Sequence, residues 1–135
     1  MFVLDASVTL GWLFEDEATP QLLELLESLA TGAAWVPVHW SLEVANAVQV
    51  AQRRGRLTRS PTELLGPLAK LRIRMDTESF TRAHGATLEL AGKHGLTTYD
   101  AAYLELAKRR GLPLATADKG LRRAAEKAAI QVLPA

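Results

Sequence analysis

The segment Phe2-Val3-Leu4-Asp5-Ala6-Ser7 sets an acidic residue directly after a short apolar run. Leu114-Ala115-Thr116-Ala117-Asp118 shows the same arrangement near the other end of the chain. Short apolar runs that alternate with amphipathic stretches are typical of βαβ units and a parallel sheet. Because the carboxyl ends of parallel strands share one edge of the sheet, Asp5 and Asp118 are predicted to lie close together there.

Two further acids lie near predicted strand-to-helix transitions. Glu43 follows Trp35-Val36-Pro37-Val38 by a few residues, and Asp100 closes Leu96-Thr97-Thr98-Tyr99-Asp100, just before an alanine- and leucine-rich stretch. Two like charges about 4 Å apart repel by up to about 4 kcal/mol at an effective dielectric constant of about 20. Four carboxylates at one sheet edge therefore indicate a bound divalent cation, and Mg²⁺ or Mn²⁺ suits oxygen ligands.

Helix capping is an alternative role for each acid taken alone. Asp5 and Asp118 are candidate N-caps, and Asp100 fits the third helical position of a capping box that begins at Thr97. Glu43 falls in the first turn of a predicted helix, where a carboxylate interacts favourably with the helix dipole. These roles stay open for the single residues, whereas the four acids together favour a metal site.

Three small polar residues accompany the acids. Ser7 and Thr116 each lie two residues from one of the terminal aspartates, and Asn46 shares a helix face with Glu43. Their hydroxyl and amide groups are candidates to hold metal-bound water or a phosphate oxygen. Capping, or an ordinary polar position at the edge of the core, is the alternative.

The alternating pattern predicts a three-layer α/β/α fold with a central, mainly parallel sheet, formed as one domain by residues 1–135. Gly66-Pro67 is expected to kink or break one of the helices, because proline lacks the backbone N–H. Strands are expected at residues 2–5, 34–38, 73–76, 113–117 and 130–133, the last at a sheet edge. Helices are expected at residues 8–15, 20–30, 41–54, 61–71, 79–93, 98–110 and 119–128.

Composition excludes several classes of protein. The 135 residues are 48% hydrophobic and 23% charged, as in an ordinary globular domain. The absence of cysteine excludes disulfides, thiolate zinc sites and cysteine nucleophiles, and fits a reducing cytoplasm. We expect no signal peptide, because an apolar strand begins at residue 2, and no membrane span, because no apolar stretch approaches about 20 residues.

A net charge of +1 means that any nucleic-acid binding must use local basic patches. Solvated helix ends are the alternative explanation, since cations suit the end of a helix and two of the patches lie beside a glycine stop signal. The patches comprise Arg53, Arg54, Arg56 and Arg59; Lys108, Arg109 and Arg110; and Lys119, Arg122, Arg123 and Lys127.

Residues 2–7, 42–47, 96–104 and 114–118 together resemble PIN-domain ribonucleases, and more narrowly the VapC-type toxins of type II toxin–antitoxin pairs. The resemblance implies an endoribonuclease that depends on Mg²⁺ or Mn²⁺. It implies that the three aspartates hold the metal and that the glutamate binds through water or orients the nucleophile. Carried over by position, the acidic quartet is Asp5, Glu43, Asp100 and Asp118, supported by Ser7, Asn46 and Thr116.

The same resemblance implies three partners: an RNA substrate, a second copy of the chain in a homodimer, and a cognate antitoxin whose tail covers the acidic pocket. An apolar face could serve either protein contact, although core packing is the preferred explanation for each of its residues. This face comprises Trp12, Leu13, Phe14, Leu22, Leu23, Leu25 and Leu26.

Two other functions are weaker alternatives. The run from Phe2 to Thr9 is similar to the nucleophile motif of haloacid dehalogenase-like phosphatases, but Ser7 stands where that motif usually has a second aspartate, and the usual downstream lysine is not evident. A non-catalytic RNA-binding or scaffold domain would keep the fold and the basic patches without needing four acids.

The remaining chemistry-bearing residues indicate no further site. The three histidines, His39, His84 and His94, lack metal-ligand spacing and are interpreted as surface or packing residues. No G-x-S-x-G nucleophile elbow occurs. Base stacking is possible for four aromatic residues, but core packing is preferred: Trp35, Trp40, Tyr99 and Tyr103.

Overall fold

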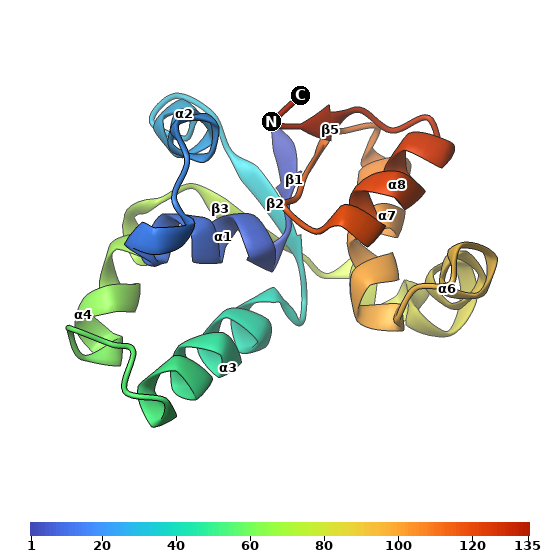
Figure 1. Ribbon diagram of the computed structural model, residues 1–135. Helices are drawn as coiled ribbons and strands as arrows, with labels where there is room; N and C mark the ends of the chain where they lie inside the picture. The colour runs from blue at the N-terminus through green and yellow to red at the C-terminus, as the bar shows by residue number, and fades with distance from the viewer.

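The computed structural model describes residues 1–135 and is built on a five-stranded sheet in the order β3-β2-β1-β4-β5. All four strand pairings are parallel, so the sheet is wholly rather than mainly parallel. The predicted three-layer α/β/α architecture is confirmed (Figure 1). The strands are β1 (Phe2–Leu4), β2 (Ala34–Pro37), β3 (Ile73–Asp76), β4 (Leu114–Ala115) and β5 (Val132–Leu133).

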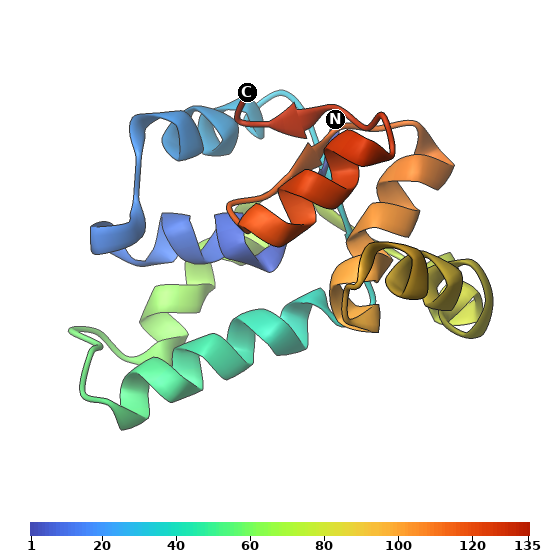
Figure 2. The same cartoon turned by 45° about the vertical axis from the view of Figure 1, so that its right-hand side comes forward.

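Helices lie on both sides of this sheet (Figures 1 and 2). On one side lie α1 (Ala6–Leu13), α2 (Pro20–Ser28), α3 (Trp40–Arg53) and α4 (Pro61–Leu65). On the other side lie α5 (Glu78–Arg82), α6 (Leu88–His94), α7 (Thr98–Arg110) and α8 (Lys119–Lys127).

Successive residues of β1 supply the two hydrophobic cores, because side chains alternate between the faces of a strand. Val3 packs with Leu104 and Leu121 beneath α7 and α8. Leu4 packs with Val8 and other residues beneath α1 and α2. Burial of both faces explains why β1 is apolar at every position before Asp5.

Several predicted boundaries were wrong near irregular backbone. The first helix begins at Ala6 rather than Val8. Asp5 is the single residue between β1 and this helix, and its backbone is still extended. The helix predicted over residues 61–71 ends at Leu65 and continues as a 3₁₀ turn, η2 (Gly66–Lys70), so the break expected at Gly66-Pro67 is confirmed. A 3₁₀ turn, η1 (Glu15–Glu17), follows α1.

The helix predicted over residues 79–93 is divided into α5 and α6. The turn between them, η3 (Ala83–Thr87), is π-helical and contains Gly85 in a non-helical conformation. The last two strands are only two residues long, shorter than predicted, although β5 does form the edge of the sheet. Gly95 and Gly111 end α6 and α7 in the left-handed conformation, as their positions predict.

The order of strands determines where a site can form. The chain leaves β1 toward β2 and β3 and then returns to place β4 on the other side of β1. In open parallel sheets, ligands bind beyond the carboxyl ends of the strands at this reversal. The first and last members of the predicted acidic quartet follow β1 and β4. No helix combines the length and hydropathy needed to cross a membrane.

Candidate active site

Asp5 lies at the carboxyl end of β1 with only 4% of its surface exposed. Its side chain does not cap α1, so the capping interpretation was wrong for this residue. Instead, Ser7 Oγ donates a 2.6 Å hydrogen bond to Asp5 Oδ2, and Thr116 Oγ1 donates one of 2.8 Å to the same oxygen. Two hydroxyl groups therefore orient the buried carboxyl group and leave Oδ1 for another partner.

Ser7 and Thr116 also accept hydrogen bonds from the loop after β4. The Ala117 N–H donates to Ser7 Oγ over 2.9 Å, and the Asp118 N–H donates to Thr116 Oγ1 over 3.0 Å. Since each hydroxyl group both donates and accepts within the site, these residues hold Asp5 and the Asp118 loop together. Their hydroxyl protons are not free for a phosphate oxygen.

Asp118 and Asp100 occupy the helix starts that their spacing predicts. Asp118 Oδ1 accepts the Leu121 N–H over 2.8 Å and so caps α8. The Asp100 N–H donates to Thr97 Oγ1 over 3.1 Å at the start of α7. The capping role is confirmed for Asp118, whereas at α7 Thr97 is the cap and the Asp100 carboxylate makes no capping hydrogen bond.

Glu43 projects from the first turn of α3 and is held from two directions. The Tyr103 hydroxyl group donates a 2.6 Å hydrogen bond to Glu43 Oε1. His39 Nε2 lies 3.0 Å from the same oxygen and 2.9 Å from the Tyr99 carbonyl oxygen. Both of these partners are acceptors, so His39 Nε2 carries a proton and bridges the first turns of α3 and α7.

The electrostatics show that the four acids share one environment. Burial raises the pKa of Asp5 to about 6, and the charges of Glu43 and Asp100 contribute to the rise. Burial is also the main cause that raises the pKa of Asp100. The charges of Asp118 and Glu43 raise this pKa further, whereas His39 lowers it. No lysine or arginine lies within 4 Å of any of the three aspartates. Negative charge therefore accumulates here without a cationic side chain to neutralise it.

The donor set suits a hard divalent cation, but it does not form a ready cage. No three acidic or histidine side chains converge closely enough to hold a metal ion by themselves. Mg²⁺ commonly keeps several waters and takes only one or two protein carboxylates. The carboxylates of this site therefore fit a cation bound largely through water.

Sequence reasoning missed the structural role of His39, which it interpreted as an ordinary surface or packing residue. The available signal was its spacing of four residues from Glu43, which places both on one helix face. Asn46, predicted to support the site, is exposed one turn beyond Glu43 and makes no hydrogen bond to the acids.

A second carboxylate cluster, which contains none of these four acids, was also missed. Asp76, at the end of β3, is 1% exposed and accepts hydrogen bonds from Arg109 Nη2 over 2.6 Å and Arg110 Nη2 over 2.8 Å. Glu105 Oε1 accepts from Arg109 Nε over 2.7 Å, and Arg110 lies 3.6 Å from the centroid of the Trp35 ring. Two cations of the predicted patch at 108–110 are therefore bound within the protein, and neither is free for nucleic acid.

The other two basic patches remain at the surface. Lys119 is exposed and follows Asp118 directly in the chain. Arg53 lies ten residues beyond Glu43 on α3, or about 15 Å at the rise of an α-helix. Arg56 pairs with exposed Asp16 over 3.3 Å. Among these cations, Lys119 is the one next to an acid of the site.

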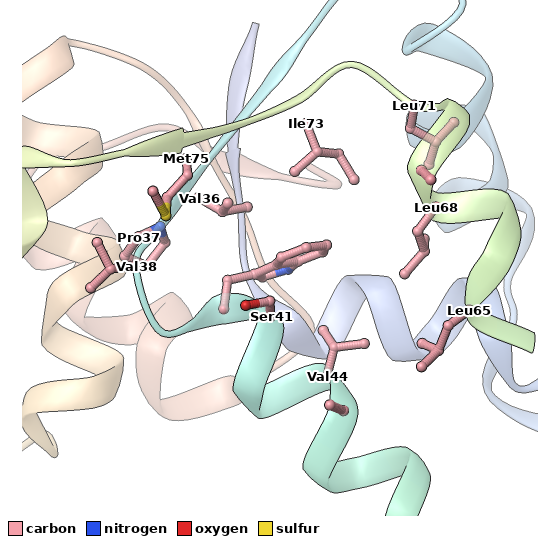
Figure 3. Close-up of a pocket in the computed structure, with 13 residues that line it drawn as sticks. Val36, Pro37, Val38, Ser41, Val44, Leu65, Leu68, Leu71, Ile73 and Met75 are labelled. Atoms are coloured by element: carbon pink, nitrogen blue, oxygen red, sulfur yellow. The ribbon is translucent and has the colours of Figure 1, made fainter. Parts of the chain in front are cut away.

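Two apolar pockets are lined by none of the four acids. One, of about 380 Å³, lies between α3, η2 and the β2–β3 edge, where Val44, Leu68 and Ile73 point toward one another (Figure 3). Another pocket, of about 610 Å³, is lined in part by Trp12 and Leu26 of the predicted apolar face.

Residues 2–127 match the family model described as PIN domain. The chain belongs to the PIN domain family. Over 93 residues it is 37% identical to Ribonuclease VapC3 from Pyrobaculum aerophilum, a match that covers 68% of this chain and 69% of that protein.

Solved structures show the same fold for this PIN domain. PAE2754 from Pyrobaculum aerophilum matches with a TM-score of 0.67 and 20% identity, over 91% of this chain and 83% of that one. FitAcB from Neisseria gonorrhoeae matches with a TM-score of 0.59 and 22% identity, over 98% and 96% of the two chains. The structure of FitAB bound to an IR36 DNA fragment matches with a TM-score of 0.65 and 21% identity, over 98% and 94%.

Proposed function

We propose that this PIN domain is a metal-dependent endoribonuclease that hydrolyses RNA phosphodiester bonds and acts as the toxin of a toxin–antitoxin pair. The observation that carries the proposal is buried Asp5, oriented by two hydroxyl groups and electrostatically coupled to Glu43 and Asp100 with no basic partner. The likeness to Ribonuclease VapC3 supports RNA as the substrate.

Asp5, Asp100 and Asp118 would hold Mg²⁺ or Mn²⁺. When bound, such a cation lowers the pKa of a coordinated water and neutralises charge on the phosphodiester. Ser7 and Thr116 keep Asp5 in one orientation, while Tyr103 holds Glu43. That hydrogen bond uses Glu43 Oε1 and leaves Oε2 to orient the attacking water.

The partners follow from the VapC-like assignment. We propose a homodimer in the cytoplasm and a cognate antitoxin whose tail covers the acidic site. The two apolar pockets support a protein partner, since each joins apolar side chains from several elements at the surface. Exposed Lys119 supports contact with the RNA backbone next to Asp118.

The test is cleavage of end-labelled total RNA by purified protein, with Mg²⁺ or Mn²⁺ and with EDTA, beside the Asp5→Asn variant. Discrete fragments that need the cation and disappear with the variant are expected. RNA binding without cleavage, equal in both proteins, would instead favour a non-catalytic scaffold. Metal-dependent release of phosphate from p-nitrophenyl phosphate, with intact RNA, would favour a phosphatase.

A further inference from the structure

Tyr99 is an exposed aromatic residue directly beside the acidic site. It precedes Asp100 in the first turn of α7, and 64% of its surface is exposed. The prediction of core packing is therefore wrong for Tyr99, whereas Tyr103 is fully buried. An exposed aromatic ring next to a catalytic carboxylate calls for a function other than folding.

Contacts with Thr97 and His39 hold the backbone and the ring of Tyr99 in place. Thr97 caps α7 in the turn that carries Tyr99, and the His39 N–H donates to the Tyr99 carbonyl oxygen over 2.9 Å. The imidazole ring of His39 lies between two tyrosines, with centroids 5.8 Å from Tyr99 and 5.3 Å from Tyr103. The exposed ring is thus the outermost of three neighbouring rings that begin in the core.

The negative charge around the Tyr99 ring favours contact with an uncharged part of the RNA. No lysine or arginine lies within 4 Å of Asp5, Asp100 or Asp118, so these carboxylates repel an RNA backbone. Aromatic rings bind nucleobases through their faces, and such stacking tolerates any base because every base has a π-face. Affinity next to Asp100 can therefore come from a base even where the phosphates are repelled.

We propose that Tyr99 is a stacking platform for an unpaired nucleobase of the RNA strand, next to the phosphate that the acids cleave. This subsite rests on the proposed ribonuclease function. His39 positions the platform by fixing the Tyr99 backbone, and it holds Glu43 through the same nitrogen. One imidazole group thus links the site for the base to the acidic site.

The test compares two strands of equal charge, an octamer of uridylate and an octamer of abasic ribose phosphates, by fluorescence anisotropy. Binding is measured in the Asp5→Asn background so that the strands stay intact. Tyr99→Ala is expected to weaken binding of the uridylate octamer about tenfold and to leave the abasic octamer unchanged. Tyr99→Phe, which keeps the ring, retains the affinity of the parent protein.

Phe80→Ala is the matched control, because Phe80 is 75% exposed but is adjacent in sequence to none of the four acids. It is expected to bind both strands like the parent protein. Equal losses on both strands with Tyr99→Ala, or no loss on either, would overturn the proposal. A loss that accompanies a change of oligomeric state in size-exclusion chromatography would overturn it as well, since Tyr99 would then contact another copy of the chain.

The cleavage assay separates this subsite from the underlying function. A metal-dependent nuclease without a base-dependent effect of Tyr99 would overturn the stacking platform alone. A base-dependent effect of Tyr99 without any RNA cleavage would overturn the nuclease and support a base-binding surface. Failure of the parent protein to distinguish the two strands would overturn the platform whatever the cleavage assay gives.

Discussion

The Tyr103 hydroxyl group donates a 2.6 Å hydrogen bond to Glu43 Oε1, joining residues that are 60 positions apart in the chain. Tyr103 is fully buried in α7, whereas Glu43 lies in the first turn of α3. Burial raises the pKa of Tyr103, and the negative charges of Asp5 and Glu43 raise it further. The hydroxyl group therefore stays protonated and remains a donor to the carboxylate.

Replacing Tyr103 with phenylalanine is expected to release Glu43 while keeping the ring in the core. We expect RNA cleavage to slow about tenfold and the free energy of unfolding to fall by about 1 kcal/mol, the contribution of one hydrogen bond. Single-turnover cleavage and urea unfolding measure the two effects. The control is Tyr99→Phe, which removes a hydroxyl group without a partner in the structure and leaves both quantities unchanged. Wild-type cleavage by Tyr103→Phe would show that this hydrogen bond does not position Glu43.

The pKa of Asp5, raised to about 6 from an ordinary 3.8, predicts how stability changes with pH. The folded protein binds this proton more tightly than the unfolded chain does. The stabilisation that the bound proton provides is therefore lost as the pH rises from 3.8 through about 6. Asp5→Asn keeps a neutral side chain at every pH. Its free energy of unfolding is expected to exceed that of wild type by about 2–3 kcal/mol at pH 7.5 without divalent cations, and to come within about 0.6 kcal/mol of it at pH 4.

Urea unfolding across this pH range, with EDTA present, measures the difference. A gap between the two proteins that does not change with pH would contradict burial as the cause. If Asp5→Asn were less stable than wild type at pH 7.5, the ionised Asp5 carboxylate would have stabilising partners other than the two hydroxyl groups.

Addition of Mg²⁺ is expected to stabilise the folded protein, because the cation offsets repulsion among carboxylates that the unfolded chain does not hold together. At ten times its dissociation constant, the cation adds about 1.4 kcal/mol to the free energy of unfolding. Thermal unfolding with and without Mg²⁺ measures the effect. Asp16→Asn, at an exposed acid outside the site, is expected to respond as wild type does, whereas Asp5→Asn loses the response. An equal response from all three proteins would assign Mg²⁺ to a different place.

Asp76→Asn tests the buried ion cluster at the end of β3. Burial alone would raise the pKa of Asp76, but the hydrogen bonds and charges of Arg109 and Arg110 outweigh it and lower the pKa. The ionised carboxylate therefore stabilises the fold above its ordinary pKa, and this contribution is lost in acid. Removing its charge leaves Arg110 without a carboxylate partner and Arg109 with Glu105 and the more distant Glu78, at a cost of about 3 kcal/mol.

The matched control for Asp76→Asn is Asp16→Asn, which breaks the exposed ion pair with Arg56. The Asp16 side chain is 72% exposed, so this change is expected to cost less than about 0.5 kcal/mol. Urea unfolding at pH 7 compares the two. Similar costs for both variants would mean that the cluster around Asp76 contributes no more than a surface pair.

The sequence predicted where the acids lie, because a local rule gives the position of an acid that follows a strand. Asp5 and Asp118 follow apolar runs, and parallel strands bring such positions to one edge wherever the intervening chain goes. The same rule applies to Asp76, which ends a predicted strand, but no local signal shows that Arg109, 33 residues away, pairs with it. The break at Gly85 was missed for a related reason: a single glycine in an amphipathic pattern does not reveal a π-helical turn.

Tyr99 and Tyr103 show the limit of reading exposure from sequence. They lie four residues apart in α7, yet one is 64% exposed and the other is buried. Tyr99 stands in the first turn, at the helix end that meets the acidic site, whereas Tyr103 lies one turn further in, against β1 and α3. Only the packing of the helix distinguishes the two side chains.

The most direct test of the central claim is the cleavage rate of end-labelled RNA in saturating Mn²⁺ for Asp5→Asn, Glu43→Gln, Asp100→Asn and Asp118→Asn, beside Asp16→Asn. Circular dichroism verifies that each variant is folded. The four substitutions within the site are expected to lower the rate at least about a hundredfold, and Asp16→Asn to leave it unchanged. Wild-type cleavage by folded Asp5→Asn or Asp100→Asn, or cleavage by the wild-type protein in EDTA, would contradict a metal-dependent acidic site.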